Sequence, residues 1–356
     1  SKGRFDEALD AYKKALSLRP NYANVYNNIG NVYKNKGELN EAIEAFNRAL
    51  TFKPDYAEAH NNKGATFIDQ CKPDEAIEAF HKALSIKPNY ADALSNMGSA
   101  LKDNGKLEAS LEAYHKALSL KPDFPEAHHN MSYTLLNSGR VKEGLDAYEW
   151  RFETEVFKSH ERNFSRPFLN KKQRLYNKTI LIWSEQGIGD TIRWSSCLSS
   201  LAAQAKHCIL ECQEKLVPLL KRSFPNVEIK PENKSFDMER DDFDFHLPMG
   251  SLYKHFVEEI TQNCKIEAFL TPHQHRVKYW KKRLKAVGKG PYVGISWKSS
   301  NIAFKRIQNY SSINDWLPIL KIPNVTFINL QNKNFAEDLN KIKIDFGVTV
   351  HNFDDL

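Results

Sequence analysis

The sequence predicts an α-helical solenoid followed by an α/β domain with parallel sheets, a fold class that follows from three observations. Prolines recur every 34 residues in the first half, at Pro20, Pro54, Pro88 and Pro122. After residue 176, short apolar runs alternate with amphipathic stretches, which is typical of parallel strands joined by crossover helices. A glycine-containing turn, residues 185–190, stands between the first of these runs and the helix after it.

Small and aromatic residues keep the same period as the prolines. In the first complete copy they are Tyr26, Ile29, Gly30, Tyr33, Ala42, Phe46, Ala49 and Pro54. A glycine or alanine lets the two helices of a pair approach closely, aromatics fill the layer between pairs, and proline ends the second helix. The pattern resembles tetratricopeptide repeats and implies a superhelix over residues 1–155. Residues 1–22 supply only the second helix of a repeat, so we expect the chain to begin inside a longer protein.

Four asparagines occupy the sixth position of the first helix in successive repeats: Asn28, Asn62, Asn96 and Asn130. In tetratricopeptide repeats this position faces the concave groove. An asparagine amide both donates and accepts hydrogen bonds, as a peptide backbone requires. We therefore expect the groove to bind a protein or peptide, with a generic solvated groove as the alternative.

Charge and composition limit the other partners. Residues 1–150 carry a net charge of −2 and the remainder +9, which fits either a lysine-rich solvated surface or a site for an anion such as a nucleotide diphosphate. Acids are interspersed among the bases, which argues against nucleic acid. No apolar run approaches the roughly twenty residues of a spanning helix, so we expect no integral membrane segment. Five cysteines without paired metal spacing predict free thiols in a reducing, cytoplasmic compartment.

The second half divides into a connection and two α/β parts. We predict a linker over residues 156–176, a first α/β domain over 177–288 and the start of a second over 289–356. Predicted strands span 179–183, 207–212, 227–231, 243–247, 292–296 and 325–329. Predicted helices span 190–204, 214–222, 274–286 and 312–319.

The turn after the first predicted strand is the chemically richest stretch. Its glycines, Gly187 and Gly189, would let a ligand approach the backbone, and its amides favour an anion. A dinucleotide fingerprint would need a third glycine at Ile192, and a Walker loop would need Gly-Lys-Ser/Thr, so neither reading is supported. The alternative is a tight strand-to-helix turn with Asp190 as the helix cap.

Four segments together carry a resemblance to a known family. They are residues 150–152 (Trp-Arg-Phe), 163–165 (Asn-Phe-Ser), 185–192 and 294–298. The chain resembles bacterial proteins in which tetratricopeptide repeats precede a glycosyltransferase domain of the GT-B type. Its plan is similar to protein O-GlcNAc transferase, and its α/β part resembles lipopolysaccharide heptosyltransferases. The resemblance implies a Rossmann-like GT-B fold and transfer of a hexose or heptose.

The same resemblance implies roles for individual residues. Asp190 matches the aspartate that activates the acceptor hydroxyl, and Arg193 stands where the relatives have a histidine, on the acceptor side. The implied donor phosphate-binding residues are Gly187, Gly189, Lys298, Ser299, Lys305, Arg306 and Gln331. The donor is a nucleotide diphosphate sugar that acts as substrate, with no cofactor and no metal. We interpret Asp242 and Asp244 as turn residues, and His273 and His275 as exposed residues at a helix start.

The chain ends after roughly two strands of the second nucleotide-binding half. We therefore expect this chain to be a fragment with little turnover, taken from a transferase that presents a protein or glycan acceptor to its donor site. The alternative is an interaction scaffold whose α/β domain binds without catalysing a reaction.

Overall fold

The computed structural model describes residues 2–158, 162, 164–170, 173–232, 239–262, 268–297, 311–331 and 335–353. The chain divides into two compact units, Ser1–Glu75 with His273–Leu356, and Ala76–Pro272. In the described residues, no helix has the length and apolar character needed to cross a membrane. Cys208 and Cys212 are buried free thiols, as predicted.

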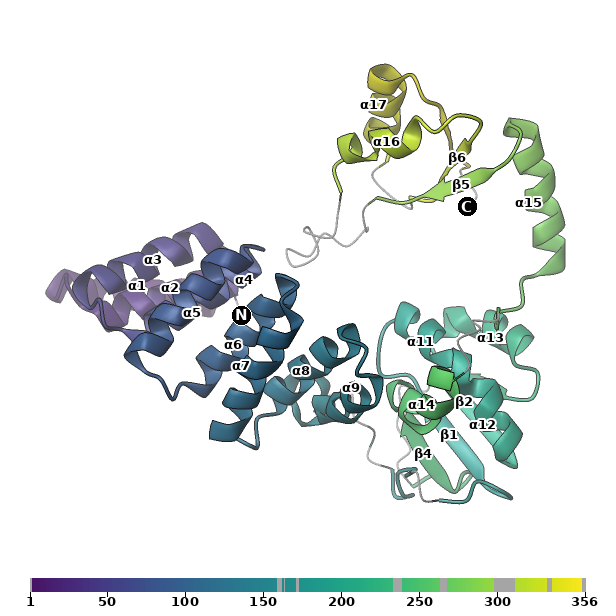
Figure 1. The fold of residues 1–356 in the computed structure, drawn as a ribbon, viewed down its shortest axis with the longest axis horizontal. Helices are drawn as coiled ribbons and strands as arrows, with labels where there is room; N and C mark the ends of the chain where they lie inside the picture. The colour runs from purple at the N-terminus through teal and green to yellow at the C-terminus, as the bar shows by residue number, and fades with distance from the viewer. Residues whose placement is uncertain are drawn as a thin grey trace. The chain divides into compact units, whose positions relative to one another are not determined.

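The N-terminal part is a helical solenoid, as the 34-residue period predicts (Figure 1). Helices pair in sequence order, and each pair is followed by a short turn. The helices are α1 (Lys2–Leu18), α2 (Ala23–Lys36), α3 (Leu39–Phe52), α4 (Ala57–Asp69), α5 (Pro73–Ile86), α6 (Ala91–Asp103), α7 (Leu107–Leu120), α8 (Pro125–Asn137) and α9 (Val141–Tyr148).

Close packing within the pairs explains the recurring small residues. A Cβ on Gly30 would lie 2.5 Å from the Phe46 ring, and one on Gly98 would lie 2.9 Å from the Tyr114 ring. Phe46 and Tyr114 are completely buried. Any larger side chain at these glycines would push the two helices of the pair apart.

The turn inside each pair uses a left-handed backbone conformation. Gly37, Gly105 and Gly139 have φ angles of 82°, 73° and 79°, and Cys71 occupies the equivalent place with a φ of 63°. Glycine adopts this conformation without steric cost, whereas a Cβ is strained there. Cys71 therefore performs a glycine's task in the one repeat that lacks it.

The second unit contains a four-stranded parallel sheet in the order β3-β2-β1-β4. All four strands were predicted, with boundaries shifted by at most two residues. They are β1 (Thr179–Trp183), β2 (His207–Cys212), β3 (Glu228–Pro231) and β4 (Phe245–Pro248). Helices α11 (Ile188–Trp194), α12 (Leu198–Gln204) and α13 (Val217–Ser223) lie between strands in sequence, and α14 (Leu252–Gln262) follows β4.

The sheet and the last solenoid helix share one core. Ile180 and Ile182 of β1 lie in the same buried cluster as Leu145 and Tyr148 from the end of α9. A salt bridge of 3.0 Å between Lys254 and Asp146 joins α14 to α9 at the surface. The last repeat therefore packs directly on the α/β domain.

Two details of the predicted helices differ from the structure. The predicted helix 190–204 is interrupted by a 3-10 turn, Ser195–Cys197, between α11 and α12. The predicted helix cap at Asp190 is wrong, because Gly187 is the N-cap and Asp190 is the third helical residue. Helix α14 was not predicted.

Residues 273–353 of the first unit form a small α/β part with a three-stranded parallel sheet, β5-β6-β7. Its elements are α15 (Gln274–Val287), β5 (Tyr292–Ile295), α16 (Leu317–Leu320), β6 (Thr326–Asn329), α17 (Ala336–Phe346) and β7 (Val350–His351). Its core contains Ile295, Trp297, Phe327 and Ile342. Both sheets are parallel, as predicted, and the GT-B arrangement of two nucleotide-binding halves stays a prediction.

Candidate functional site

The loop that follows β1 is exposed at the carboxyl edge of the four-stranded sheet. Gly187, Ile188 and Gly189 are exposed, and the half-buried Asp190 follows in the first turn of α11. Because β1 is an inner strand, a ligand at this loop would contact the edge where parallel sheets commonly bind ligands.

Two polar side chains, the buried Thr191 and the half-buried Gln213, fix the loop in place. Thr191 Oγ1 lies 3.2 Å from the Gly187 carbonyl and 3.1 Å from Gln213 Oε1. The amide of Gln213, just beyond β2, donates to the Gln186 carbonyl at 2.6 Å. The loop is thus held by its neighbouring strand end before any ligand arrives. Sequence reasoning missed Gln213, which belongs to no recognisable motif.

The two loop glycines are not required by the fold. Neither has a positive φ, a Cβ on Gly189 would meet nothing within 4 Å, and a Cβ on Gly187 would meet only Asp190 Oδ2 at 3.6 Å. Gly250, by contrast, stands where a Cβ would collide with Glu185 Oε1. Space above Gly187 and Gly189 is therefore available to something outside the chain.

A buried ionic network lies directly beneath the loop. Arg151 is fully buried and donates to Glu185 Oε1 at 3.2 Å, Ser251 Oγ at 2.8 Å and Glu149 Oε1 at 2.8 Å. The amide of Gly250 donates to the same Glu185 oxygen at 3.0 Å.

Aromatic rings enclose this network and shape its charges. The Arg151 guanidinium carbon lies 4.5 Å from the Tyr148 ring centroid and 4.2 Å from that of Phe152. Burial raises the pKa of Glu185, while Arg151 and the Gly250 amide favour its charged form. The network ties the end of the solenoid to the first residues of the loop, because Gln186 also donates to the Tyr148 hydroxyl.

Helix α8 brings an aromatic surface from the last repeat to the loop. The His129 ring lies 5.1 Å from Tyr133 and 5.6 Å from Tyr148. Tyr133 is 40% exposed. Burial raises the pKa of Tyr133 and the charge of Asp190 raises it further, whereas Arg151 and Arg193 lower it. The Tyr148 ring also lies 6.0 Å from Trp194, so aromatic rings connect α8 with the helix that follows the loop.

The four asparagines are not equivalent. Asn28 is exposed, whereas Asn62, Asn96 and Asn130 are half-buried. The Asn62 amide donates to Asn27 Oδ1 in the preceding repeat at 3.0 Å. Part of the series thus supports contacts between repeats, and Asn130 lies on α8, next to His129 in sequence.

The predicted donor residues are only partly visible. Lys298, Ser299, Lys305 and Arg306 lie outside the described residues. Gln331 is buried, and its side-chain oxygen accepts from the Trp297 amide at 3.2 Å. Gln331 therefore fixes the chain just beyond the end of β5.

The aspartates and histidines whose spacing could suggest a metal site have other positions or partners in the structure. Asp242 pairs with Arg240 at 2.9 Å, and Asp244 accepts from the Thr179 amide at 2.8 Å. His273 is the N-cap of α15, and both it and His275 are exposed. In the described parts of the chain, no three His, Cys, Asp or Glu side chains are grouped to hold a metal ion.

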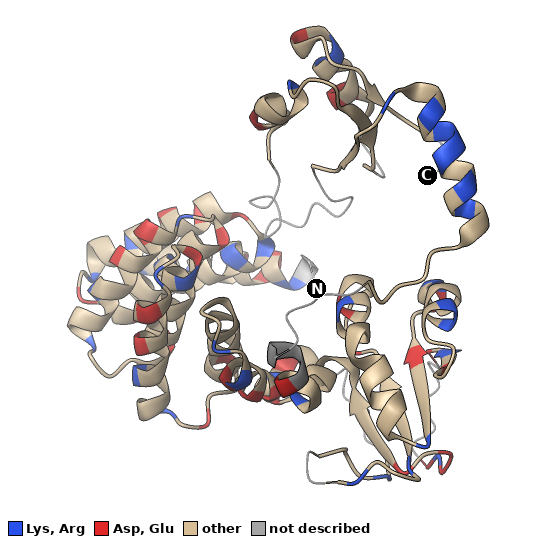
Figure 2. Cartoon of the chain, turned by 45° about the vertical axis from the view of Figure 1, so that its right-hand side comes forward, with Lys and Arg blue, Asp and Glu red and all other residues tan. Residues whose placement is uncertain are grey.

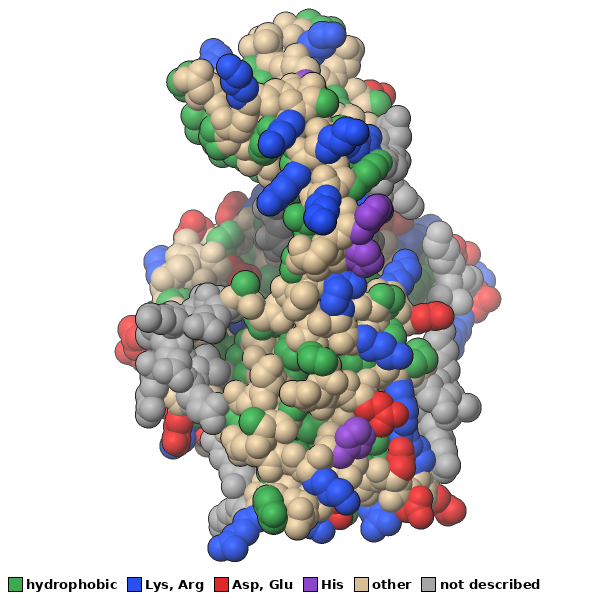
Figure 3. Space-filling model, turned by 90° about the vertical axis from the view of Figure 1, so that its right-hand side faces the viewer, with side chains coloured by type: hydrophobic (Ala, Val, Ile, Leu, Met, Phe, Trp, Pro, Cys, Tyr) green, Lys and Arg blue, Asp and Glu red, His purple; other side chains and the backbone are tan. Residues whose placement is uncertain are grey.

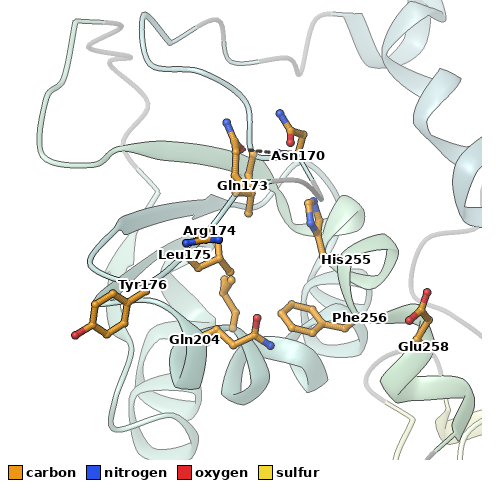
Figure 4. Close-up of a pocket in the computed structure, with 11 residues that line it drawn as sticks. Asn170, Gln173, Arg174, Leu175, Tyr176, Gln204, His255, Phe256 and Glu258 are labelled. Atoms are coloured by element: carbon orange, nitrogen blue, oxygen red, sulfur yellow. Dashed lines mark hydrogen bonds between the residues drawn. The ribbon is translucent and has the colours of Figure 1, made fainter.

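A separate hollow of about 560 Å³ lies beside the segment that precedes β1 (Figure 4). Leu175, Leu201 and Phe256 form apolar parts of its wall, and Gln204 and His255 add polar groups. None of the predicted site residues lines it. Since it adjoins residues before β1, it lies toward the opposite edge of the sheet from the 187–190 loop.

Comparison with known proteins identifies the repeats. Two models of the tetratricopeptide repeat match this chain, one at residues 1–37, 30–70 and 98–139 and the other at 57–90. The solenoid is built of tetratricopeptide repeats. The resemblance stated for the first half of the chain is therefore confirmed.

Several known proteins are similar to part of this chain. Protein FlbA of Caulobacter vibrioides is 30% identical over 192 residues, which cover 50% of this chain and 32% of FlbA. The chain thus spans about a third of the length of this curated relative. A crystal structure of MamA is 29% identical with a TM-score of 0.39, covering 45% of this chain and 94% of MamA. A crystal structure of YrrB, described as a TPR protein with an unusual peptide-binding site, is 23% identical with a TM-score of 0.36, covering 44% and 80%.

Proposed function

We propose that the solenoid binds an extended protein segment and delivers it to the loop after β1, where the α/β part transfers a sugar from a nucleotide diphosphate sugar. Protein binding is the usual use of tetratricopeptide repeats. One observation carries the delivery step: the Tyr148 ring lies 6.1 Å from Tyr133 of α8 and 6.0 Å from Trp194 of α11, the helix that begins in this loop. A chain that runs along the groove past α8 would arrive at this loop.

In the proposed reaction, an acceptor hydroxyl attacks the anomeric carbon of the donor sugar. A new carbon–oxygen bond forms, the bond to the diphosphate breaks, and Asp190 takes the proton of the hydroxyl. The exposed Arg193 lies one turn of helix further and would orient the acceptor. Bound positive charge must balance the departing diphosphate, a role we assign to Lys298, Lys305 and Arg306.

Other residues complete the proposed site. Gly187 and Gly189 would admit the reacting groups, since neither position is filled by the fold. Ser299 and Gln331 would complete the donor side, and Asn28, Asn62, Asn96 and Asn130 the peptide groove. The transfer chemistry rests on the resemblance of the sequence motifs to GT-B enzymes. A cytoplasmic location, which free thiols favour, belongs to the same proposal.

Ligand-observed NMR with a panel of nucleotide diphosphate sugars tests the donor site, on the unaltered chain and on a Gly189→Ala variant. Gly189→Ala is the sharpest variant, because its methyl group has free space in the fold and would occupy only the ligand's space. We expect Gly189→Ala to weaken sugar-nucleotide or acceptor binding without loss of stability. Asp190→Asn should keep donor binding and abolish transfer.

Two results would contradict this proposal, each at a different point. If no nucleotide sugar binds to the unaltered chain, the transferase proposal fails and the α/β part is a non-catalytic element of a protein-binding scaffold. If donors bind but Asp190→Asn keeps its transfer rate, Asp190 is not the base.

A further inference from the structure

Helix α15 carries an unusual concentration of positive charge. It contains Arg276, Lys278, Lys281, Lys282, Arg283 and Lys285 but no acid. The surrounding sequence adds no balancing charge, because residues 268–314 contain no aspartate or glutamate. Figure 2 shows α15 as a nearly continuous basic helix, and in Figure 3 the basic side chains gather along it.

The lysines occupy one face of the helix. Lys278, Lys281, Lys282 and Lys285 follow the i, i+3, i+4, i+7 spacing of a single stripe, and all four are exposed. Like charges at these spacings disfavour a helix. The stripe therefore lowers the stability of α15 unless an anionic partner neutralises it.

The opposite face fixes the direction in which the stripe points. The Trp280 ring lies 5.3 Å from Phe353, and the Arg283 guanidinium lies 4.5 Å from the same ring. Trp280, Arg283 and Leu284 are half-buried. Because this face packs on the part of the chain that follows β7, the lysine face points to solvent.

We propose that the lysine face of α15 docks on an anionic lipid bilayer. An exposed helix face is convex, so it does not enclose a small ligand, but it can lie along an extended charged surface. A bilayer attracts positive charge diffusely, and compact lysine ammonium groups suffice for this. Tyr279, 38% exposed beside the stripe, is a residue type favoured at the boundary between headgroups and hydrocarbon.

Nucleic acid fits the same face less well. Recognition of phosphate by nucleic-acid-binding proteins commonly uses the forked guanidinium of arginine, and single strands stack their bases on aromatic rings. On α15, Arg283 and Trp280 lie on the half-buried face, and the four-residue exposed stripe contains lysine alone. One exposed arginine, Arg276, and one exposed aromatic ring, Tyr279, lie beside the stripe, so most of the charge on this face comes from lysine.

Vesicle flotation tests the proposal, using the purified chain with phosphatidylcholine vesicles that contain or lack phosphatidylglycerol. We expect binding to the anionic vesicles at low salt, loss at high salt, and none to neutral vesicles. Each lysine should contribute about fivefold in affinity, so K281Q/K282Q should weaken binding roughly 25-fold. The quadruple variant, which also carries K278Q and K285Q, should not bind.

The control removes the same charge elsewhere. K13Q/K14Q changes two adjacent exposed lysines of α1 and should bind like the unaltered chain. Circular dichroism should show that the α15 variants keep their helix content, since they relieve like-charge repulsion. Vesicle binding that survives the quadruple substitution would overturn the proposal. Tighter binding to duplex DNA than to anionic vesicles, lost in the same variants, would replace the bilayer by nucleic acid.

Discussion

Among the glycines with ordinary backbone angles, the structure distinguishes those that close packing requires from those beside open space. Gly30, Gly98 and Gly250 stand where a Cβ would meet Phe46, Tyr114 or Glu185 at less than a normal contact distance. Gly187 and Gly189 have no such neighbour. The sequence alone does not separate these two groups of glycines. The neighbouring atoms that separate them belong to residues elsewhere in the chain.

Replacing Cys71 by glycine should stabilise the folded protein. Its φ of 63° places a Cβ in the left-handed region, where the equivalent residue of three other repeats is glycine. We expect Cys71→Gly to raise the free energy of unfolding by about 0.5–1 kcal/mol, because relief of strain exceeds the added flexibility of the unfolded chain. Urea denaturation measures the change. Gly105→Cys, at the equivalent turn, should lower stability by a similar amount, and an increase there would contradict the explanation.

The lowered pKa of the buried His246 implies that acid destabilises the second unit. Burial among aromatic rings lowers the pKa of His246 from 6.5 to about 4, and its Nδ1 lies 3.3 Å from the Trp183 indole nitrogen. The unfolded chain binds this proton more readily, so stability is complete above pH 6.5 and is lost as the pH falls toward 4. The loss should reach up to about 3 kcal/mol.

Urea denaturation across this pH range tests the His246 prediction. His246→Gln, which keeps an acceptor for Trp183, should show a smaller decrease. His129, with a pKa also lowered to about 4 by burial and then by Arg151, adds to the total. If the free energy of unfolding falls equally steeply with pH in His246→Gln and in the unaltered chain, groups other than His246 cause the loss.

At the scale of elements, three of the four motif segments lie at the junction between the last repeat and the four-stranded sheet. Arg151 ion-pairs with Glu185, Phe152 packs 6.1 Å from Trp183, and Phe164 packs 5.3 Å from Phe243. These segments were quoted as signs of a transferase family. In the structure, their best-defined task is to hold the last repeat against β1, with the 187–190 loop immediately above.

The junction predicts strong coupling between Arg151 and Glu185. Arg151→Met leaves the buried carboxylate without its main partner and should cost about 3–5 kcal/mol. Glu185→Gln should also destabilise, and the double variant should lose clearly less than the sum of the two. Urea unfolding of the unaltered chain, the two single variants and the double variant gives the double-mutant cycle. Additive losses would show that the two side chains act independently. Lys254→Gln, which removes a surface ion pair at the same junction, should cost under about 1 kcal/mol.

Local elements were largely predictable because their signals are local. Strand β1 is an apolar run and α8 repeats a known period, so both follow from neighbouring residues. The interruption at Ser195–Cys197 and the helices α14 and α17 were not predicted, although α14 has a clearly amphipathic sequence. The contact of Thr191 with Gln213 joins residues 22 positions apart and appears only when β1 and β2 pair.

For the molecule as a whole, the sequence correctly predicted a solenoid followed by parallel sheets. It also predicted the candidate loop, because a strand, two glycines and a helix follow in order. It did not predict the buried network, in which Glu149, Glu185 and Ser251 converge on Arg151 from three separate elements. Nor did it predict the direction of the α15 lysines, which depends on the packing of Trp280 against Phe353.

The core shared by α9 and β1 protects the last repeat of the solenoid. In a repeat array, each pair is stabilised mainly by its neighbours. Here Leu145 and Tyr148 anchor the last repeat in the cluster that contains Ile180 and Ile182. The last repeat should therefore unravel after the repeats that precede it. Under load or in mild denaturant, the groove would shorten one repeat at a time while the surface beside Asp190 stayed assembled to the end.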